Sequence, residues 1–128
     1  MDNANRTILI VDDEVHIRRI LELKFKNAGF RVLAAKNGQE GLDLVHKESP
    51  DAVISDINMP KLDGKTFCLM TDPLKQQRPF LTIMVTARIH PEDQVWTEQL
   101  CDTVLIQKPF SPARILETVY DYFSAGGL

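Results

Sequence analysis

Cysteines, long apolar runs and basic clusters are scarce in this chain of 128 residues. Its two cysteines, Cys68 and Cys101, lack the spacing of a disulfide framework or a zinc site, so we expect two reduced thiols. No apolar segment approaches the ~20 residues that span a bilayer, and no signal peptide precedes the first predicted strand. The formal net charge of -3 comes without a basic stripe, which argues against nucleic acid binding. We therefore expect a cytoplasmic domain with no membrane or nucleic acid contact.

The chain does contain a repeated alternation of short apolar runs and longer amphipathic stretches. The runs are rich in β-branched residues, which is typical of buried parallel strands, and the stretches between them suit crossover helices. The runs cover residues 7–11, 31–35, 51–55, 80–85 and 104–107. Without a linker, this pattern predicts one domain over residues 1–128, with a core of about 6–124. The predicted fold class is α/β: a doubly wound, flavodoxin-like parallel sheet of five strands in the order 2-1-3-4-5, with helices on both faces.

Start and stop signals between these runs predict the helices. Asn37 is an N-cap for the second helix, with Glu40 completing a capping box. The third helix is interrupted at Asp72-Pro73, where a turn or a second helical start is expected. Pro91 opens the fourth helix and Ser111-Pro112 the last. The first helix covers residues 14–28, and its predicted inward face consists of Ile17, Ile20, Leu21, Phe25 and Ala28.

Four of the predicted strands end in polar residues of different kinds. Asp12 and Asp13 follow the first strand and Asp56 the third. Thr86 follows the fourth strand and Lys108 the fifth. All strands of a parallel sheet point the same way, so these ends meet at the carboxyl edge, where open α/β sheets place their sites. The sequence therefore predicts three carboxylates, one hydroxyl and one ammonium at a single site.

Three carboxylates at adjacent strand ends repel one another. Two unit charges about 4 Å apart repel by roughly 4 kcal/mol at an effective dielectric of about 20. A third charge adds to this, and Lys108 alone does not neutralise the cluster. Mg²⁺ takes oxygen ligands, uses one or two protein carboxylates and leaves positions for water or phosphate oxygens. Asp12, Asp13 and Asp56 therefore predict a magnesium site that is open to a phosphoryl group.

The remaining groups match phosphoryl transfer, which asks a protein mainly to position the group and neutralise its oxygens. Asp56 stands alone at the end of the central strand, where a carboxylate nucleophile can form an acyl phosphate. Thr86 can donate a hydrogen bond to one phosphoryl oxygen, and Lys108 can pair with another. Pro109 makes a cis peptide accessible after Lys108, and that bond would aim the lysine inward.

With these residues the chain resembles the receiver domain of two-component response regulators, whose simplest members are single-domain chemotaxis regulators. The resemblance implies that Asp56 is the phosphoacceptor, supplied by a sensor histidine kinase or a phosphotransfer protein. It implies that Asp13, Asp56 and the backbone carbonyl of Asn58 bind Mg²⁺, with Asp12 acting through a water. Thr86 and Lys108 would hold the phosphoryl oxygens. The resemblance extends from Ile8 to Phe123 and rests on Val11-Asp12-Asp13-Glu14, Asp56-Ile57-Asn58-Met59-Pro60 with Gly64, Thr86-Ala87 and Lys108-Pro109-Phe110.

The resemblance also implies a switch rather than an enzyme with turnover. Phosphoryl uptake would be self-catalysed and followed by slow autodephosphorylation. Movement at the site would signal to a downstream effector protein or domain through the face made by the fourth helix, the fifth strand and the fifth helix. The chain departs from the family at Leu105, where an aromatic residue is common, at Cys101-Asp102, where Gly-Ala is usual, and at the Asp72-Pro73 break.

Three other functions fit parts of the pattern. A phosphohydrolase of the haloacid dehalogenase type also uses a strand-end aspartate and Mg²⁺, but it needs a second acid where this chain has Asn58. A flavodoxin-like electron carrier shares the sheet order, but Asp12-Asp13 would repel a flavin phosphate. A degenerate receiver that only binds partners is disfavoured by the intact set of site residues.

Overall fold

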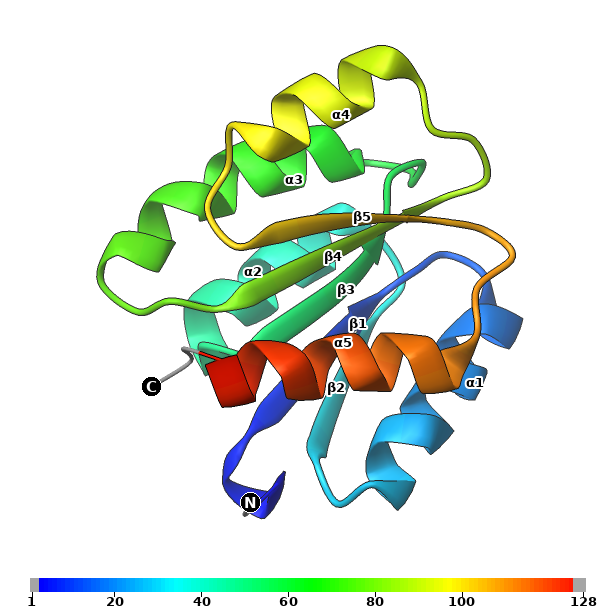
Figure 1. Cartoon of the computed structure of the whole chain (residues 1–128), viewed down its shortest axis with the longest axis vertical. Coiled ribbons are helices and arrows are strands. Elements are labelled where there is room, and N and C mark those ends of the chain that lie inside the picture. The colour runs from blue at the N-terminus through cyan, green and yellow to red at the C-terminus, as the bar shows by residue number, and fades with distance from the viewer. Residues whose placement is uncertain (1–2, 126–128) are drawn as a thin grey trace.

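Five parallel strands form a single sheet at the centre of the molecule (Figure 1). The computed structural model describes residues 3–125. The sheet order is β2-β1-β3-β4-β5, so the predicted α/β class and strand order are confirmed. The strands are β1 (Thr7–Val11), β2 (Arg31–Ala35), β3 (Ala52–Asp56), β4 (Leu81–Thr86) and β5 (Thr103–Gln107).

Within residues 3–125, five α-helices cover the two faces of the sheet, with α1 and α5 on one face and α2, α3 and α4 on the other (Figure 1). Every residue of β1, β3 and β4 is buried, whereas β2 and β5 are partly exposed at the edges. This difference explains why the three central runs are the most continuously apolar. The helices are α1 (Val15–Asn27), α2 (Gly38–Glu48), α3 (Gly64–Thr71), α4 (Pro91–Glu98) and α5 (Pro112–Ala125), with 3₁₀ turns η1 (Asn3–Asn5) and η2 (Asp72–Gln76).

The predicted cap of α2 forms in a modified way. The Asn37 side chain accepts a hydrogen bond from the Glu40 amide over 2.9 Å. The Glu40 carboxylate, however, accepts from the amide of Lys36 over 3.2 Å rather than from the amide of the cap residue itself. The helix start is therefore where the sequence places it, but the second half of the capping box reaches one residue further back.

The predicted inward face of α1 is wrong at one position. Leu21 and Phe25 are buried in the core, but Ile20 is 40% exposed. The helix contacts the sheet through a narrower stripe than its apolar pattern indicates. Ile20 instead lines an open groove between α1 and the start of α5, opposite Pro112.

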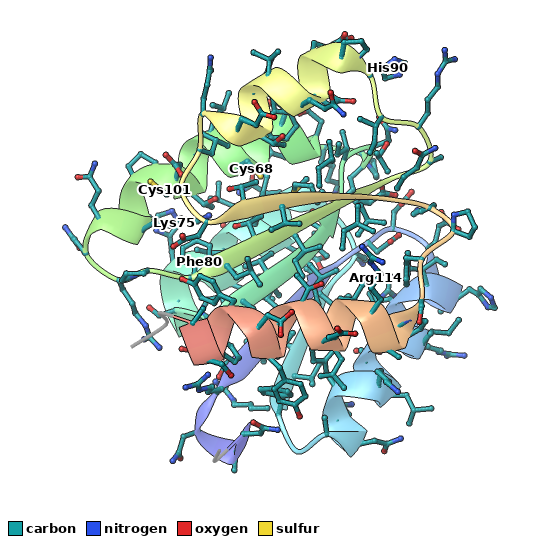
Figure 2. All side chains as sticks on the ribbon, in the orientation of Figure 1. Cys68, Lys75, Phe80, His90, Cys101 and Arg114 are labelled. Carbon is teal, nitrogen blue, oxygen red and sulfur yellow. The ribbon has the colours of Figure 1, made fainter. Side chains whose placement is uncertain are left out.

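The two unusual segments of the sequence pack against each other. The break at Asp72 ends α3 and begins η2, as predicted. From η2 the buried ammonium of Lys75 donates hydrogen bonds to Cys101 O, Asp102 O and Thr103 Oγ1 in the turn before β5, over 2.5, 3.3 and 3.3 Å (Figure 2). The Asp72 carboxylate accepts from the amide of Cys101 over 2.9 Å. Two of the three departures from the family pattern, at Asp72-Pro73 and at Cys101-Asp102, thus form the two sides of one contact.

Both thiols are free, as expected, with Cys68 buried in the core and Cys101 exposed. None of the helices formed by residues 3–125 combines the length and apolar character that a bilayer crossing needs.

Candidate functional site

Three carboxylates meet at the carboxyl edge of the sheet. Asp12 and Asp13 follow β1, and Asp56 ends the adjacent strand β3, where Val11 pairs with Ser55. One carboxylate oxygen from each aspartate lies within 4.8 Å of the others. Asp12 and Asp56 are buried, while Asp13 is exposed at the mouth of the cluster. The strand ends therefore bring these side chains together as the sequence predicts.

Burial makes the charge on Asp12 unfavourable. Loss of solvent raises the pKa of Asp12 to about 6, and the neighbouring charge of Asp56 acts in the same direction. The backbone amide of Glu14 opposes this shift by donating to the Asp12 carboxylate over 2.9 Å. The pocket thus carries more negative charge than the protein's own groups neutralise. Three oxygen donors at this spacing fit a hard divalent cation such as Mg²⁺.

Lys108 supplies the positive charge of the site. Its ammonium lies 3.3 Å from Oδ2 of Asp56 and 3.6 Å from Oε1 of Glu14. Burial alone would lower the pKa of Lys108, but the carboxylates of Asp56, Asp12 and Glu14 outweigh it and raise that pKa. The peptide between Lys108 and Pro109 is cis, as the sequence allows. Lys108 therefore stays protonated beside Asp56.

Thr86 lies one residue beyond the strand pair that holds Asp56. Asp56 pairs with Val85 across β3 and β4, and Thr86 is only 2% exposed. Its hydroxyl donates a hydrogen bond to the carbonyl of Arg88 over 3.0 Å. The Thr86 carbonyl accepts from the amide of Lys108 over 2.7 Å. Thr86 thus lies next to the acidic cluster, and its hydroxyl donates to the loop that follows β4.

Asn58 lies in the loop of residues 57–63 that joins β3 to α3. Its amide donates to Oδ1 of Asp56 over 3.2 Å. The loop closes tightly, because the amide of Gly64 donates to the carbonyl of Ile57 over 2.7 Å. A Cβ on Gly64 would lie 2.7 Å from the carbonyl oxygen of Asp56, which explains the glycine of the motif.

Two residues take part in the site without having been assigned a role from the sequence. Glu14 contacts Lys108, and the Arg18 guanidinium donates to the backbone carbonyl of Asp12 over 2.8 Å. Glu14 is the N-cap of α1, so its place directly after the acidic pair was a usable signal. Arg18 lies one turn into that helix, and its position offered no such signal.

An apolar groove runs beside the charged cluster. It lies between α1 and the segment that leads into α5, and has a volume of about 440 Å³. A second hollow continues it along α1 through Ile20 and Leu23, which are 40% and 61% exposed. We call this surface the α1–α5 groove; its first part is lined by Ile17, Ile20, Ala87, Lys108, Pro109, Phe110 and Pro112. Lys108, whose ammonium lies beside Asp56, is part of this lining.

Residues 8–120 match the family model described as the response regulator receiver domain. The chain is 38% identical over 115 residues to the probable transcriptional regulator ycf27 of Porphyra purpurea, covering 90% of this chain and 46% of that protein. It is 36% identical over 112 residues to the alkaline phosphatase synthesis transcriptional regulatory protein PhoP of Bacillus subtilis, covering 87% and 45%. The chain therefore spans about half the length of these curated relatives.

Solved structures agree with this match. The chemotaxis response regulator CheY4 of Vibrio cholerae superposes with a TM-score of 0.80 at 30% identity, covering 90% of this chain and 96% of that one. The co-crystal structure of the Saccharomyces cerevisiae histidine phosphotransfer signaling protein Ypd1 and the receiver domain of Ssk1 matches with a TM-score of 0.84, covering 96% and 92%. At 19% identity, this second likeness shows the fold alone.

Proposed function

Because the chain belongs to the response regulator receiver family of two-component systems, we propose that Asp56 accepts a phosphoryl group from the phosphohistidine of a sensor histidine kinase or a phosphotransfer protein. A carboxylate oxygen of Asp56 attacks phosphorus, the bond between phosphorus and the histidine nitrogen breaks, and that nitrogen keeps the electron pair. The observation that carries this proposal is the buried Asp56 carboxylate between an acidic pair and an ammonium 3.3 Å away.

The acidic cluster serves this reaction by holding Mg²⁺. We assign Asp13, Asp56 and the backbone carbonyl of Asn58 as its ligands, with Asp12 acting through a water. When bound, the ion neutralises the carboxylates and the incoming phosphoryl oxygens. The support is the spacing of the three carboxylates, which face the single ammonium of Lys108, and the burial that raises the pKa of Asp12.

Lys108 and Thr86 hold the phosphoryl oxygens in this proposal and transmit the change. Lys108 already lies beside Asp56 and pairs with an oxygen of the new group. Thr86 exchanges its hydrogen bond to the Arg88 carbonyl for one to the phosphoryl group, which moves the loop after β4. The output face is α4, β5 and α5, where Val95 and Val104 are exposed apolar side chains for an effector protein or domain.

The α1–α5 groove is the proposed contact for the phosphodonor. It is apolar, it leads to Lys108, and it includes the exposed side chain of Leu23. A helix of the donor that buried these residues would carry its phosphohistidine to the mouth of the acidic cluster.

The reaction leaves this chain covalently modified and is followed only by slow autodephosphorylation, so the protein acts as a switch rather than a turnover enzyme. We place this switch in the cytoplasm. A haloacid dehalogenase mechanism would need an acid at position 58 to protonate a leaving group, and the amide of Asn58 cannot do so. An electron carrier is disfavoured as well, because the carboxylates of Asp12 and Asp13 would repel a flavin phosphate.

Incubation with acetyl phosphate and Mg²⁺ tests this function. Intact-mass measurement should show one added phosphoryl group on the wild type and none on Asp56→Asn. Asp13→Ala should lose magnesium binding in a calorimetric titration and take up phosphate far more slowly. Equal labelling of wild type and Asp56→Asn would remove the assignment of Asp56, and unlabelled wild type would favour a receiver that only binds partners.

A further inference from the structure

Gly38, the first residue of α2, presses against the backbone of the phosphorylation-site loop. A Cβ at position 38 would lie 2.0 Å from the carbonyl oxygen of Leu62 and 2.9 Å from its carbonyl carbon. Real Cβ atoms essentially never approach other atoms closer than 3.0 Å. Of the glycines within residues 3–125, Gly29 is the one with a left-handed φ, so Gly38 is required for space rather than for its conformation.

The loop that Gly38 contacts is the one that follows Asp56. One end is held where the amide of Ile57 donates to the carbonyl of Val85 over 3.1 Å. Its middle is fixed by the buried side chain of Met59. Leu62 is the point at which the far side of the loop meets α2. The start of α2 therefore limits how closely the Leu62 side of the loop can approach this helix.

The loop contains backbone strain that such a contact would maintain. Lys61 has a φ of 70°, in the left-handed region that disfavours residues with a side chain. This conformation is unfavourable for a residue with a side chain and persists only where the surrounding structure enforces it. Leu62, the next residue, is the one that Gly38 holds in place.

We propose that Gly38 is a positioning residue for the phosphorylation site: the absence of a side chain lets the loop close onto α2 and so places the Asn58 backbone beside Asp56. This inference rests on the proposed function. An alanine at position 38 would have to move the Leu62 carbonyl by about 1 Å, since a 2.0 Å contact must open to at least 3.0 Å. Mg²⁺ demands near-ideal ligand positions, so a shifted loop binds it poorly.

Gly41 provides a matched control on the same helix. A Cβ there would also be crowded, at 2.9 Å from Cγ2 of Val11 and 3.3 Å from Cε2 of Phe67. These neighbours are core side chains rather than the loop backbone. Gly41→Ala therefore reports the effect of crowding α2 against the core, and Gly38→Ala reports that effect together with displacement of the loop.

The experiment compares wild type, Gly38→Ala, Gly41→Ala and Leu62→Ala. Urea unfolding without metal measures stability, calorimetric titration measures magnesium affinity, and acetyl phosphate measures the rate of labelling. We expect Gly38→Ala to lose on the order of 10- to 100-fold in magnesium affinity, as for other residues that orient metal ligands, and to be labelled more slowly. Gly41→Ala should be less stable than wild type but bind Mg²⁺ within about twofold of it.

Leu62→Ala keeps the carbonyl and Cβ that face Gly38 but removes the rest of a side chain that packs against the core on this side of the sheet. It loosens the loop from its own side without a clash, so it remains informative if Gly38→Ala fails to fold. It should bind Mg²⁺ several-fold more weakly than wild type. Wild-type magnesium affinity in either Gly38→Ala or Leu62→Ala would overturn the inference, as would an equal loss in Gly41→Ala. If the wild type itself neither binds Mg²⁺ nor takes up phosphate, it is the proposed function that fails.

Discussion

Neutralising Asp12 should stabilise the metal-free protein. Asp12 is 3% exposed, and burial, reinforced by the charge of Asp56, raises its pKa from 3.8 to about 6. The folded form therefore holds the carboxyl proton of Asp12 more tightly than the unfolded chain does. The free energy of unfolding consequently falls as pH rises from about 4 to about 6. One pKa unit corresponds to about 1.4 kcal/mol, so above this range the charged carboxylate destabilises the folded state by about 3 kcal/mol.

Asp12→Asn removes the charge while keeping the shape of the side chain. Its amide oxygen can still accept the hydrogen bond that Glu14 donates over 2.9 Å. With a chelator present, we expect this variant to exceed the wild type in unfolding free energy by about 2–3 kcal/mol at pH 7. The difference should fall below about 1 kcal/mol near pH 4, where the wild-type carboxylate is protonated in the folded state and partly protonated in the unfolded chain. Added Mg²⁺ should narrow the difference at pH 7, because the ion stabilises the wild-type cluster.

Urea unfolding followed by the fluorescence of Trp96 measures these free energies at both pH values. Asp121→Asn, an exposed carboxylate on α5, is the control and should match the wild type throughout. If Asp12→Asn is no more stable than wild type at pH 7, or if its advantage is undiminished at pH 4, then burial and mutual repulsion do not set the energy of the acidic cluster.

Two further predictions concern the turn before β5 and the two thiols. Lys75→Met removes the ammonium that donates to Cys101, Asp102 and Thr103. It also removes a buried charge, whose unfavourable environment is seen in the lowered pKa of Lys75. We expect a change in unfolding free energy of only about 1 kcal/mol, but faster amide hydrogen exchange across residues 101–103; unchanged exchange would contradict the contact. Burial raises the pKa of the Cys68 thiol to about 12, whereas Cys101 is exposed, so iodoacetamide should label one thiol in the folded protein and two in guanidinium chloride. Labelling of Cys68 in the folded protein would show that α3 opens readily.

Much of the fold follows from short-range features of the sequence. The break at Asp72, the helix start at Pro91 and the N-cap at Asn37 each depend on residues within about one turn, and all three appear in the structure. The sheet order follows from the βα repeat and the right-handed crossover, which leave few alternatives for five parallel strands. For the same reason the meeting of Asp12, Asp13 and Asp56 was predictable from their places at strand ends.

The contacts that were not predictable join residues far apart in the chain. Lys75 and Cys101 are 26 positions apart, and no periodic pattern links η2 to the turn before β5. Ile20 has the spacing of a core residue, yet it lines the α1–α5 groove, because the packing of α1 in the assembled domain decides which part of its apolar face is covered.

The sequence by itself determined the class of fold, the strand order and the gathering of acids and a lysine at one edge, because periodicity, caps and strand ends are local signals and parallel strands share a direction. Only the tertiary structure decided that Asp12 is buried, that the Thr86 hydroxyl is directed at Arg88, and that Gly38 lies against Leu62. Those outcomes depend on how closely loops and helices approach once the sheet has formed, and such distances are set by the packing of the whole domain.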